Sequence, residues 1–419
     1  MQQLEAKHEI ICSMPYEQFG YFGWPTIAGM PDGTLVVGTS GLRSGHICPW
    51  GKTVLFFSCN NGKTWSSPKV INDSPLDDRD CGLVSLGGKK LLATWFSTAY
   101  CIIPGRMTEV TPDLDMWRHD WKEMYGAEAL EDLDEICRPQ HVYDQTVEKW
   151  QNAWCRLSRD GGNNWGDWVE TPVNAPHGPA VLADGSMLYL GKHWNKGLGH
   201  HSGAFEAFHS SDDGQSWQYK GTVPIPDDTI KYNFYEAHVV ELPSGKLLGM
   251  LRYQHFKLVN YPEAEKVKQL NLSEREKKLS CNPRYPELGL FQTESNDGGK
   301  TWTEAKYVNN ANGVPPHLML HSSGAVICTY SYRSKPYGIR LMISRDEGKT
   351  WKTNYVLRSD GASRDLGYPS SVELADGTIL TVYYQQLAKG EKCSLVSSYW
   401  KLPVVKKTKK RQLKAEAAF

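Results

Sequence analysis

The amino-acid sequence predicts an all-β fold, a six-bladed β-propeller. Three observations point to it: a turn motif that occurs five times, a hairpin that occurs six times, and a composition rich in turn-forming and aromatic residues. The chain has 419 residues, among them 38 Gly, 23 Pro, 15 Trp and 21 Tyr, which suits one large domain built from repeated units. We therefore predict a single propeller domain over residues 1–404, followed by a basic tail over 405–419.

The turn motif has the pattern Ser-x-(Asp/Asn)-x-Gly-x-x-Trp. An Asp or Asn side chain can accept hydrogen bonds from the backbone amides of a tight turn, and Gly takes the left-handed position. The Trp is expected to cover the outside of the hairpin. The further ligands and terminal Glu of an EF-hand calcium loop are absent, so we predict a structural role. The five copies begin at Ser58, Ser158, Ser210, Ser295 and Ser344.

The second repeat is an inner hairpin that alternates with these outer hairpins. Six inner hairpins and five Trp-bearing outer ones, with the variant "CSLVSSYW" ending the last unit, make six four-stranded blades. The N-terminal stretch "HEIICSMP" is predicted to supply a strand that closes the ring against the last blade. The inner turns lie near Gly33, Gly88, Gly185, Gly245, Gly324 and Gly377.

Two segments do not fit a blade. Residues 104–145 and 255–285 are polar, contain helix-forming residues and interrupt blades 2 and 4. We expect helical insertions there. They could roof a binding site or join copies of the chain in a homo-oligomer, and solvated helices are the alternative.

Composition and charge exclude several functions. Lys plus Arg and Asp plus Glu number 47 each, so no net charge favours nucleic acid or a membrane surface as a partner. No apolar run approaches the roughly 18 residues of a membrane span, and the N-terminus lacks the pattern of a secretory signal. The ten Cys are scattered as single residues, which indicates neither a disulfide framework nor a metal site. We expect a cytoplasmic protein that needs no metal and no cofactor.

The inner strands predict where a ligand would bind. The start of each inner strand and the end of the next strand should meet at one face of the propeller, which we call the mouth. Glu236 and Arg252 stand at this end of one hairpin. The corresponding positions carry polar and aromatic residues, unlike the apolar strands that they precede: Trp24, Arg79, Asp80, His177, His317 and Tyr368.

The turn motif resembles the Asp-box, or BNR repeat, of the sialidase-like (neuraminidase) superfamily, and the resemblance runs from about residue 20 to 400. It implies a tyrosine nucleophile, an exception among glycosidases. Tyr368 in "DLGYPSS" resembles that tyrosine, and Glu236 in "YEAHVV" resembles the carboxylate that draws off its proton. Arg252, and Arg340 in "YGIRLMI", resemble two of the three arginines that hold the substrate carboxylate.

The first blade departs from the family pattern. Trp24 stands where the first arginine is expected, and the loop "GLRSGHICPWGKT", which should carry the aspartate general acid/base, offers Arg43 and His46 instead. We expect proton transfer to be taken over either by His46, whose ordinary pKa of about 6.5 suits it at neutral pH, or by the carboxylic acid of Asp80. The expected substrate-binding residues besides Arg252 and Arg340 are Arg79, Arg43, Trp24 and His177.

These residues leave three functions open. The first is a retaining exo-glycosidase of sialidase type, which would remove sialic acid or a related terminal acidic sugar. The second is a uronide-directed lyase that uses Tyr and His, with extra histidines at His193, His200 and His201. The third is a carbohydrate-binding propeller without activity. An unsaturated product that absorbs ultraviolet light would separate the lyase from the hydrolase.

Overall fold

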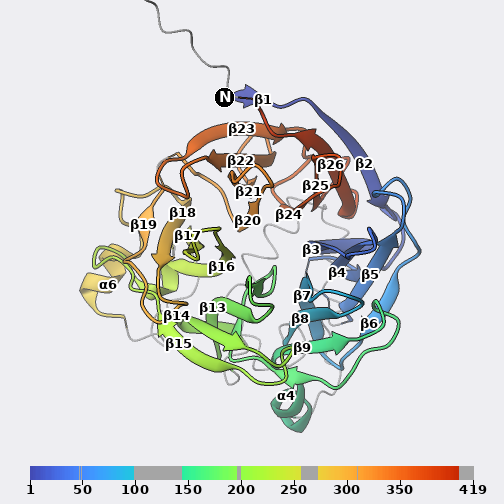
Figure 1. The fold of residues 1–419 in the computed structure, drawn as a ribbon, viewed down its shortest axis with the longest axis horizontal. Coiled ribbons are helices and arrows are strands. Elements are labelled where there is room, and N and C mark those ends of the chain that lie inside the picture. Colours follow the sequence, from blue (N-terminus) through green and yellow to red (C-terminus); the bar gives the residue numbers. More distant parts are fainter. Residues whose placement is uncertain are drawn as a thin grey trace, which may run out of the picture.

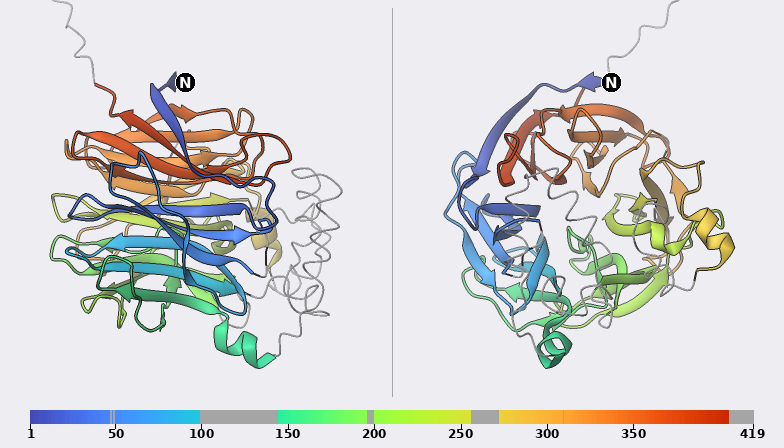
Figure 2. Two further views of the ribbon diagram at one scale, coloured as in Figure 1. Left: turned by 90° about the vertical axis from the view of Figure 1, so that its right-hand side faces the viewer. Right: turned by 180° about the vertical axis from the view of Figure 1, so that it is seen from behind.

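The computed structural model forms a ring of six sheets about a central axis, and their strands are antiparallel except for one short N-terminal strand (Figure 1). Seen from the side, the strands run across the thickness of the disc (Figure 2). The predicted six-bladed propeller is confirmed. Most of both predicted insertions and the whole basic tail lie outside the part of the chain that the structure describes. It describes residues 1–46, 48, 50–98, 144–195, 200–255, 272–308 and 310–404.

Each blade begins with its strand nearest the axis and proceeds outward. Blade 1 contains β3 (Tyr21–Gly29), β4 (Leu35–Arg43), β5 (Lys52–Ser58) and β6 (Lys69–Asn72). Blade 2 contains β7 (Asp77–Ser85), β8 (Leu91–Thr98), β9 (Asn152–Ser158) and β10 (Val169–Glu170). Blade 3 contains β11 (Val173–Asn174), β12 (Ala180–Val181), β13 (Met187–Asn195), β14 (His200–Ser210) and β15 (Gln218–Thr222).

The second half of the ring repeats this plan. Blade 4 contains β16 (Phe234–Glu241), β17 (Leu247–Gln254), β18 (Leu288–Ser295) and β19 (Lys306–Tyr307). Blade 5 contains β20 (Pro316–Leu320), β21 (Val326–Tyr332), β22 (Gly338–Ser344) and β23 (Lys352–Arg358). Blade 6 contains β24 (Leu366–Glu373), β25 (Thr378–Gln385) and β26 (Ser394–Lys401). Three short helices are described: α4 (Asp144–Trp150), the 3₁₀ helix η1 (Lys231–Asn233) and α6 (Glu274–Leu279).

The N-terminal segment closes the ring, as the sequence predicted. Strand β2 (Ala6–Cys12) pairs antiparallel with β26 and completes blade 6. The preceding strand β1 (Gln2–Gln3) then pairs parallel with β23 of blade 5. One segment of the chain therefore covers the outer edges of two neighbouring blades, which would otherwise expose unpaired backbone groups.

The Asp-box turns follow the geometry that their residues predict. In the fourth box, the Ser295 hydroxyl donates to Asp297 at 2.8 Å and accepts from the amide of Gly299 at 2.9 Å. The Asp297 carboxylate accepts from the amide and the hydroxyl of Thr301. The Trp302 indole donates to the Gly299 carbonyl at 3.0 Å, so the ring lies over its own turn.

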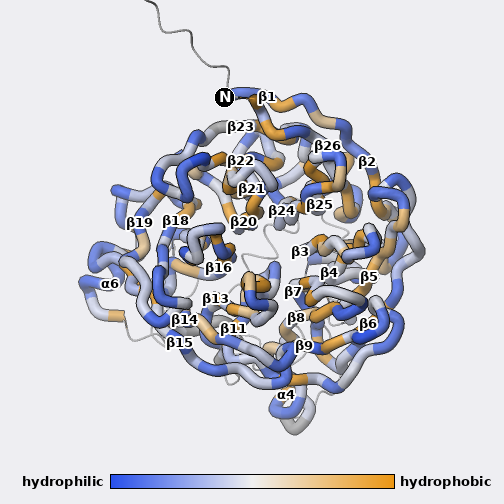
Figure 3. Tube along the Cα trace, viewed as in Figure 1, coloured by the Kyte–Doolittle hydropathy of each residue, from blue (hydrophilic) through white to orange (hydrophobic). Residues whose placement is uncertain are grey.

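Apolar side chains fill the spaces between adjacent sheets. One cluster joins blades 3 and 4 and includes Leu190, Phe205, Val239 and Phe291, and another joins blades 5 and 6. The hydrophobic segments lie within the blades and the hydrophilic ones follow the rim (Figure 3). Among the described helices, none is long and apolar enough to cross a membrane.

Candidate active site

A shared backbone irregularity aims side chains into the mouth. The pairing of the innermost two strands shifts register next to Trp24, Asp80, Glu236 and Tyr368, in blades 1, 2, 4 and 6. Three of these residues have a positive φ: 55° at Trp24, 50° at Asp80 and 48° at Tyr368. Such bulges redirect a side chain, and left-handed non-glycine residues are costly enough to concentrate at functional sites.

Tyr368, Glu236 and Arg252 form a hydrogen-bonded triad at the mouth. The Tyr368 hydroxyl donates to Glu236 Oε1 at 2.6 Å, and Arg252 donates to Glu236 Oε2 at 2.6 Å and to the Tyr368 oxygen at 3.1 Å. Burial and the charge of Glu236 raise the pKa of Tyr368 well above 10. The phenol therefore holds its proton at neutral pH, with a carboxylate in place to receive it. The sequence predicted all three residues, and the structure brings them together.

Asp80 interacts electrostatically with all three members of this triad. Its side chain is 5% exposed. Burial raises its pKa to about 7, while the charge of Arg79 lowers it and the charge of Glu236 raises it further. The charge of Asp80 also raises the pKa of Tyr368. Asp80 is thus a carboxyl group that titrates near neutrality beside the triad.

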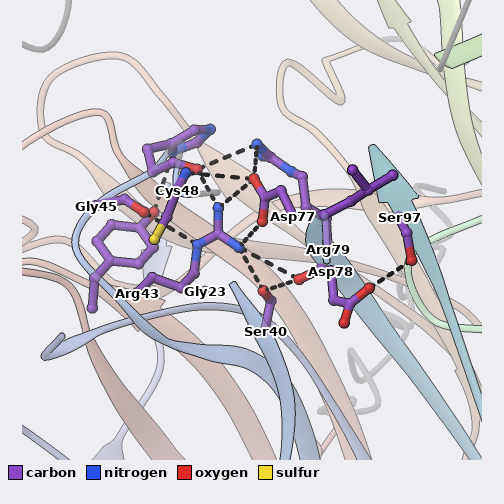
Figure 4. Close-up of polar contacts among 12 residues, drawn as sticks. Gly23, Ser40, Arg43, Gly45, Cys48, Asp77, Asp78, Arg79 and Ser97 are labelled. Atoms are coloured by element: carbon purple, nitrogen blue, oxygen red, sulfur yellow. Dashed lines mark hydrogen bonds and ion pairs between the residues drawn. The ribbon is translucent and has the colours of Figure 1, made fainter. Parts of the chain in front are cut away.

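The Arg43 side chain is buried and hydrogen-bonded to protein groups next to the mouth. Its guanidinium donates to both carboxylate oxygens of Asp77, at 2.6 and 2.9 Å, and to Ser40 Oγ at 2.8 Å (Figure 4). It also donates to the carbonyls of Gly45 and His46, at 3.1 and 2.9 Å, and it is 0% exposed. Arg43 was expected to bind substrate, but the structure directs its donors to protein acceptors.

Two arginines lie against the Trp24 ring. The guanidinium carbons of Arg43 and Arg79 lie 4.9 and 4.4 Å from its ring centroid, and the ring is 2% exposed. Arg79 also donates to the His46 carbonyl at 3.3 Å and lies 3.6 Å from Asp77. In place of an arginine, blade 1 thus contributes an aromatic face that positions Arg79, the cation supplied by blade 2.

His46 is anchored by a carboxylate that sequence reasoning missed. Its Nδ1 lies 2.9 Å from Oδ1 of Asp365. The Tyr384 hydroxyl donates to the same oxygen at 3.1 Å, and the Tyr21 hydroxyl donates to Oδ2 at 3.1 Å. Burial lowers the pKa of His46, and the charge of Asp365 opposes that shift. Asp365 immediately precedes β24, so the rule that inner strands start at the mouth could have identified it.

The arginine that blade 5 brings to Tyr368 is Arg333. Its guanidinium carbon lies 5.7 Å from the Tyr368 ring centroid. Arg340, the residue expected there, donates to the carbonyls of Arg358 and Pro336 and lies over Tyr332 instead. The structure therefore does not place Arg340 with the triad. Arg333 directly follows β21, a position from which the sequence could have predicted it.

Comparisons with known proteins agree with this architecture. A family model described as a BNR repeat-like domain matches residues 258–381. The crystal structure of a protein of unknown function from Dyadobacter fermentans superimposes with a TM-score of 0.68 at 21% identity, over 95% of this chain and 98% of that one. No curated protein matches the chain.

Several solved sialidases share the architecture at lower identity. Trypanosoma rangeli sialidase, in complex with the inhibitor DANA, matches with a TM-score of 0.57 at 14% identity, over 94% of this chain and 59% of that one. NanB sialidase from Streptococcus pneumoniae matches with a TM-score of 0.58 at 14% identity, over 94% and 70%. The fold is that of the sialidase-like, BNR-repeat propellers. At such identities the likeness establishes the fold and not the reaction.

This sialidase-like propeller carries three clustered histidines on or next to the innermost strands of blades 3, 4 and 5, which we call the axial histidines. The ring centroids of His177, His238 and His317 lie 4.6 to 5.7 Å apart, and His177 lies 6.4 Å from Tyr368. Burial lowers the pKa of each, so all three are neutral at pH 7. His177 and His317 were identified from the sequence, and His238 was not.

The axial histidines do not form a metal site. His238 Nδ1 accepts from the Leu318 amide at 3.0 Å, so its proton lies on Nε2, and that nitrogen has no lone pair to give. Within the described ranges, no group of three or more His, Cys, Asp or Glu side chains is placed to hold a metal ion. Of the other histidines considered, His193 contacts Glu206 and is exposed; the side chains of His200 and His201 lie outside the described residues.

Proposed function

We propose that the protein is a retaining exo-glycosidase of sialidase type that removes a terminal acidic sugar. The observation that carries the proposal is the Tyr368–Glu236–Arg252 triad, with its contacts of 2.6, 2.6 and 3.1 Å. A phenol is a poor nucleophile at its ordinary pKa and needs a base within hydrogen-bonding distance. Glu236 meets that requirement.

Tyr368 would attack the anomeric carbon while its proton passes to Glu236. Arg252 contacts both partners, so it would limit the build-up of negative charge as the proton moves. A neutral nucleophile suits an anionic sugar, because a carboxylate in its place would repel the substrate. The proton for the departing oxygen would come from His46 or Asp80, the two residues predicted for that role.

The substrate carboxylate would bind among three cations. Arg252 and Arg333 flank Tyr368, and Arg79 reaches the mouth over Trp24. Guanidinium groups suit a carboxylate because they donate in a planar fork. Arg252 is already engaged with Glu236, so Arg333 and Arg79 would supply much of the attraction for the substrate.

The test is the release of fluorophore from a fluorogenic α-sialoside by the native chain and by Tyr368→Phe. Tyr368→Phe removes one oxygen and preserves the ring. Release by the native chain that falls at least about 10²-fold in the variant would support the proposal. Equal release by both would refute a tyrosine nucleophile, and no release by the native chain would exclude sialic acid as the substrate.

A uronide lyase is the second candidate, and the axial histidines favour it. His177 lies close to Tyr368, and a neutral imidazole could take the proton next to a uronate carboxylate while the tyrosine protonates the leaving oxygen. Ultraviolet absorbance of an unsaturated product from an acidic oligosaccharide would support this function over the first.

A further inference from the structure

The irregularity that directs Glu236 into the mouth differs from those in the other blades. Where β17 has the single residue Arg252, β16 has two, Tyr235 and Glu236. This two-against-one pattern is a β-bulge, which we call the blade 4 bulge. In blades 1, 2 and 6 the residue next to the register shift is itself in the left-handed region, but Glu236 has no positive φ. Contacts from outside the strand are therefore needed to account for its direction.

A lysine from blade 3 holds the blade 4 bulge by its backbone. Lys192 lies near the end of β13, and its Nζ donates to the carbonyl of Lys231 at 3.0 Å and to the carbonyl of Phe234. Lys231 begins η1, and the Phe234 carbonyl belongs to the peptide bond that leads into Tyr235. One side chain of the neighbouring blade thus ties together the turn before the bulge and the first peptide of the bulge.

The Tyr235 ring links the same lysine to the triad. Lys192 Nζ lies 5.6 Å from the centroid of this ring, and the Arg252 guanidinium carbon lies 5.2 Å from it. A cation within about 6 Å of an aromatic face is attracted by the ring. Arg252 in turn donates to Glu236 Oε2 at 2.6 Å and to the Tyr368 oxygen at 3.1 Å. Lys192 is therefore connected to Glu236 both through the backbone of the bulge and through the Tyr235 ring.

Lys192 is buried at a position where packing alone would favour an apolar side chain. It is 2% exposed, and burial lowers its pKa to about 7, with the charge of Lys231 lowering it further. An amine that has lost its proton still carries two N–H groups, so Lys192 can donate to both carbonyls on either side of that pKa. The position thus depends on the two donors and not on the charge.

We infer that Lys192 is a positioning residue, which holds the blade 4 bulge so that the Glu236 carboxylate reaches Tyr368. The inference rests on the proposed function, in which Glu236 accepts the proton of Tyr368. That transfer uses the 2.6 Å contact between the two side chains, and a misplacement of about 1 Å can lower a rate by about 10²-fold. Lys192 acts through the backbone that carries Glu236 and not on the substrate.

A double-mutant cycle in rate tests this role. Lys192→Met keeps most of the side-chain length and removes both donors. For an aryl α-sialoside it should lower kcat by about 10–10²-fold and change KM by less than about threefold. Glu236→Gln should lower kcat by about 10²–10⁴-fold. In the Glu236→Gln background, Lys192→Met should have almost no further effect, because a residue that acts through the carboxylate has no role once the carboxylate is gone.

The matched control is Lys69→Met. Lys69 Nζ also donates to two backbone carbonyls, those of Gly162 and Asn163, both at 2.9 Å, but it joins the outer strand β6 of blade 1 to the second Asp-box. Its replacement should leave kcat and KM at their native values. If Lys192→Met also leaves them unchanged, or if its loss multiplies with that of Glu236→Gln, the inference is refuted while the proposed function stands.

Amide hydrogen exchange tests the bulge without any substrate. Residues 231–237 should exchange at least about tenfold faster in Lys192→Met than in the native chain, because two buried carbonyls lose their donor and the segment opens more easily. Lys69→Met should instead speed exchange at residues 158–165 and leave 231–237 as they are in the native chain. Unchanged exchange at 231–237 in Lys192→Met would refute the role of Lys192.

The two measurements separate the inference from the function on which it rests. If the native chain cleaves no sialoside, sialic acid falls as the substrate, and the exchange measurement still decides whether Lys192 holds the bulge. Lys192→Gln, whose shorter side chain stays polar, replaces Lys192→Met in both measurements if the methionine variant does not fold.

Discussion

Replacement of Arg43 by Met should destabilise the fold and leave substrate affinity unchanged. Arg43 and Asp77 have side-chain exposures of 0% and 2%, and their two contacts measure 2.6 and 2.9 Å. Removing one partner of such a pair leaves a buried charge and costs about 3–5 kcal/mol. Because total stability is typically about 5–15 kcal/mol, we expect a large fall in the urea midpoint. With an unfolding entropy of about 2.1 cal/mol/K per residue over 419 residues, the same loss lowers Tm by roughly 3–6 °C.

A double-mutant cycle in urea measures the pair itself. Asp77→Leu removes the carboxylate, and the double variant removes both charges. We expect the double variant to be more stable than the sum of the single losses predicts, with a coupling of about 1–3 kcal/mol. An Arg43→Met variant with unchanged stability and a raised KM would contradict this reasoning, because it would make Arg43 a substrate ligand.

Three further predictions concern two carboxyl groups with shifted pKa values and the outer sheet edges that the N-terminal segment covers. Because the pKa of buried Asp80 rises from 3.8 to about 7, native stability should fall as pH rises from about 4 to 7, and urea unfolding should find a smaller fall in Asp80→Asn. The hydrogen bonds of Thr301 lower the pKa of Asp297 from 3.8 to about 2, so the contribution of Asp297 to folding stability should be lost as pH falls from about 4 to 2. The stability of Asp297→Asn in urea should therefore depend less on acid than that of the native chain. Equal acid sensitivity would contradict this role of the Thr301 hydrogen bonds. Deletion of residues 1–12 exposes the edges of β23 and β26, so light scattering should detect association, and a monomer with native Tm would count against the role of these strands.

The fold was predictable because its determinants are local. Each Asp-box specifies its own turn through contacts within eight residues, as the Ser295–Trp302 box does. Glu236, Arg252 and Tyr368 could also be found, since a propeller brings the ends of its inner hairpins together. The same rule points to Asp365 and Arg333, which adjoin β24 and β21.

Side-chain direction at other positions was not predictable. The β22–β23 register shifts between Ile339 and Arg340, and the Arg340 guanidinium donates to the carbonyls of Arg358 and Pro336, contacts that no sequence spacing indicates. The partner of Arg43 lies 34 residues further along the chain, and no spacing rule connects the two. A residue type can therefore be predicted for the mouth, whereas its partners depend on how neighbouring blades pack.

The closing strand has a consequence for how the protein is made. Residues Ala6–Cys12 find their partner strand only at Ser394–Lys401. At about 5–20 residues per second, the ribosome would finish β26 on the order of a minute or less after β2 has emerged. Strand β2, which precedes the inner strands of all six blades, can thus dock only after β26 has been made, and ring closure becomes a late step of folding. Until then the sheet edges at both ends of the open ring are available to chaperones, or to another nascent chain.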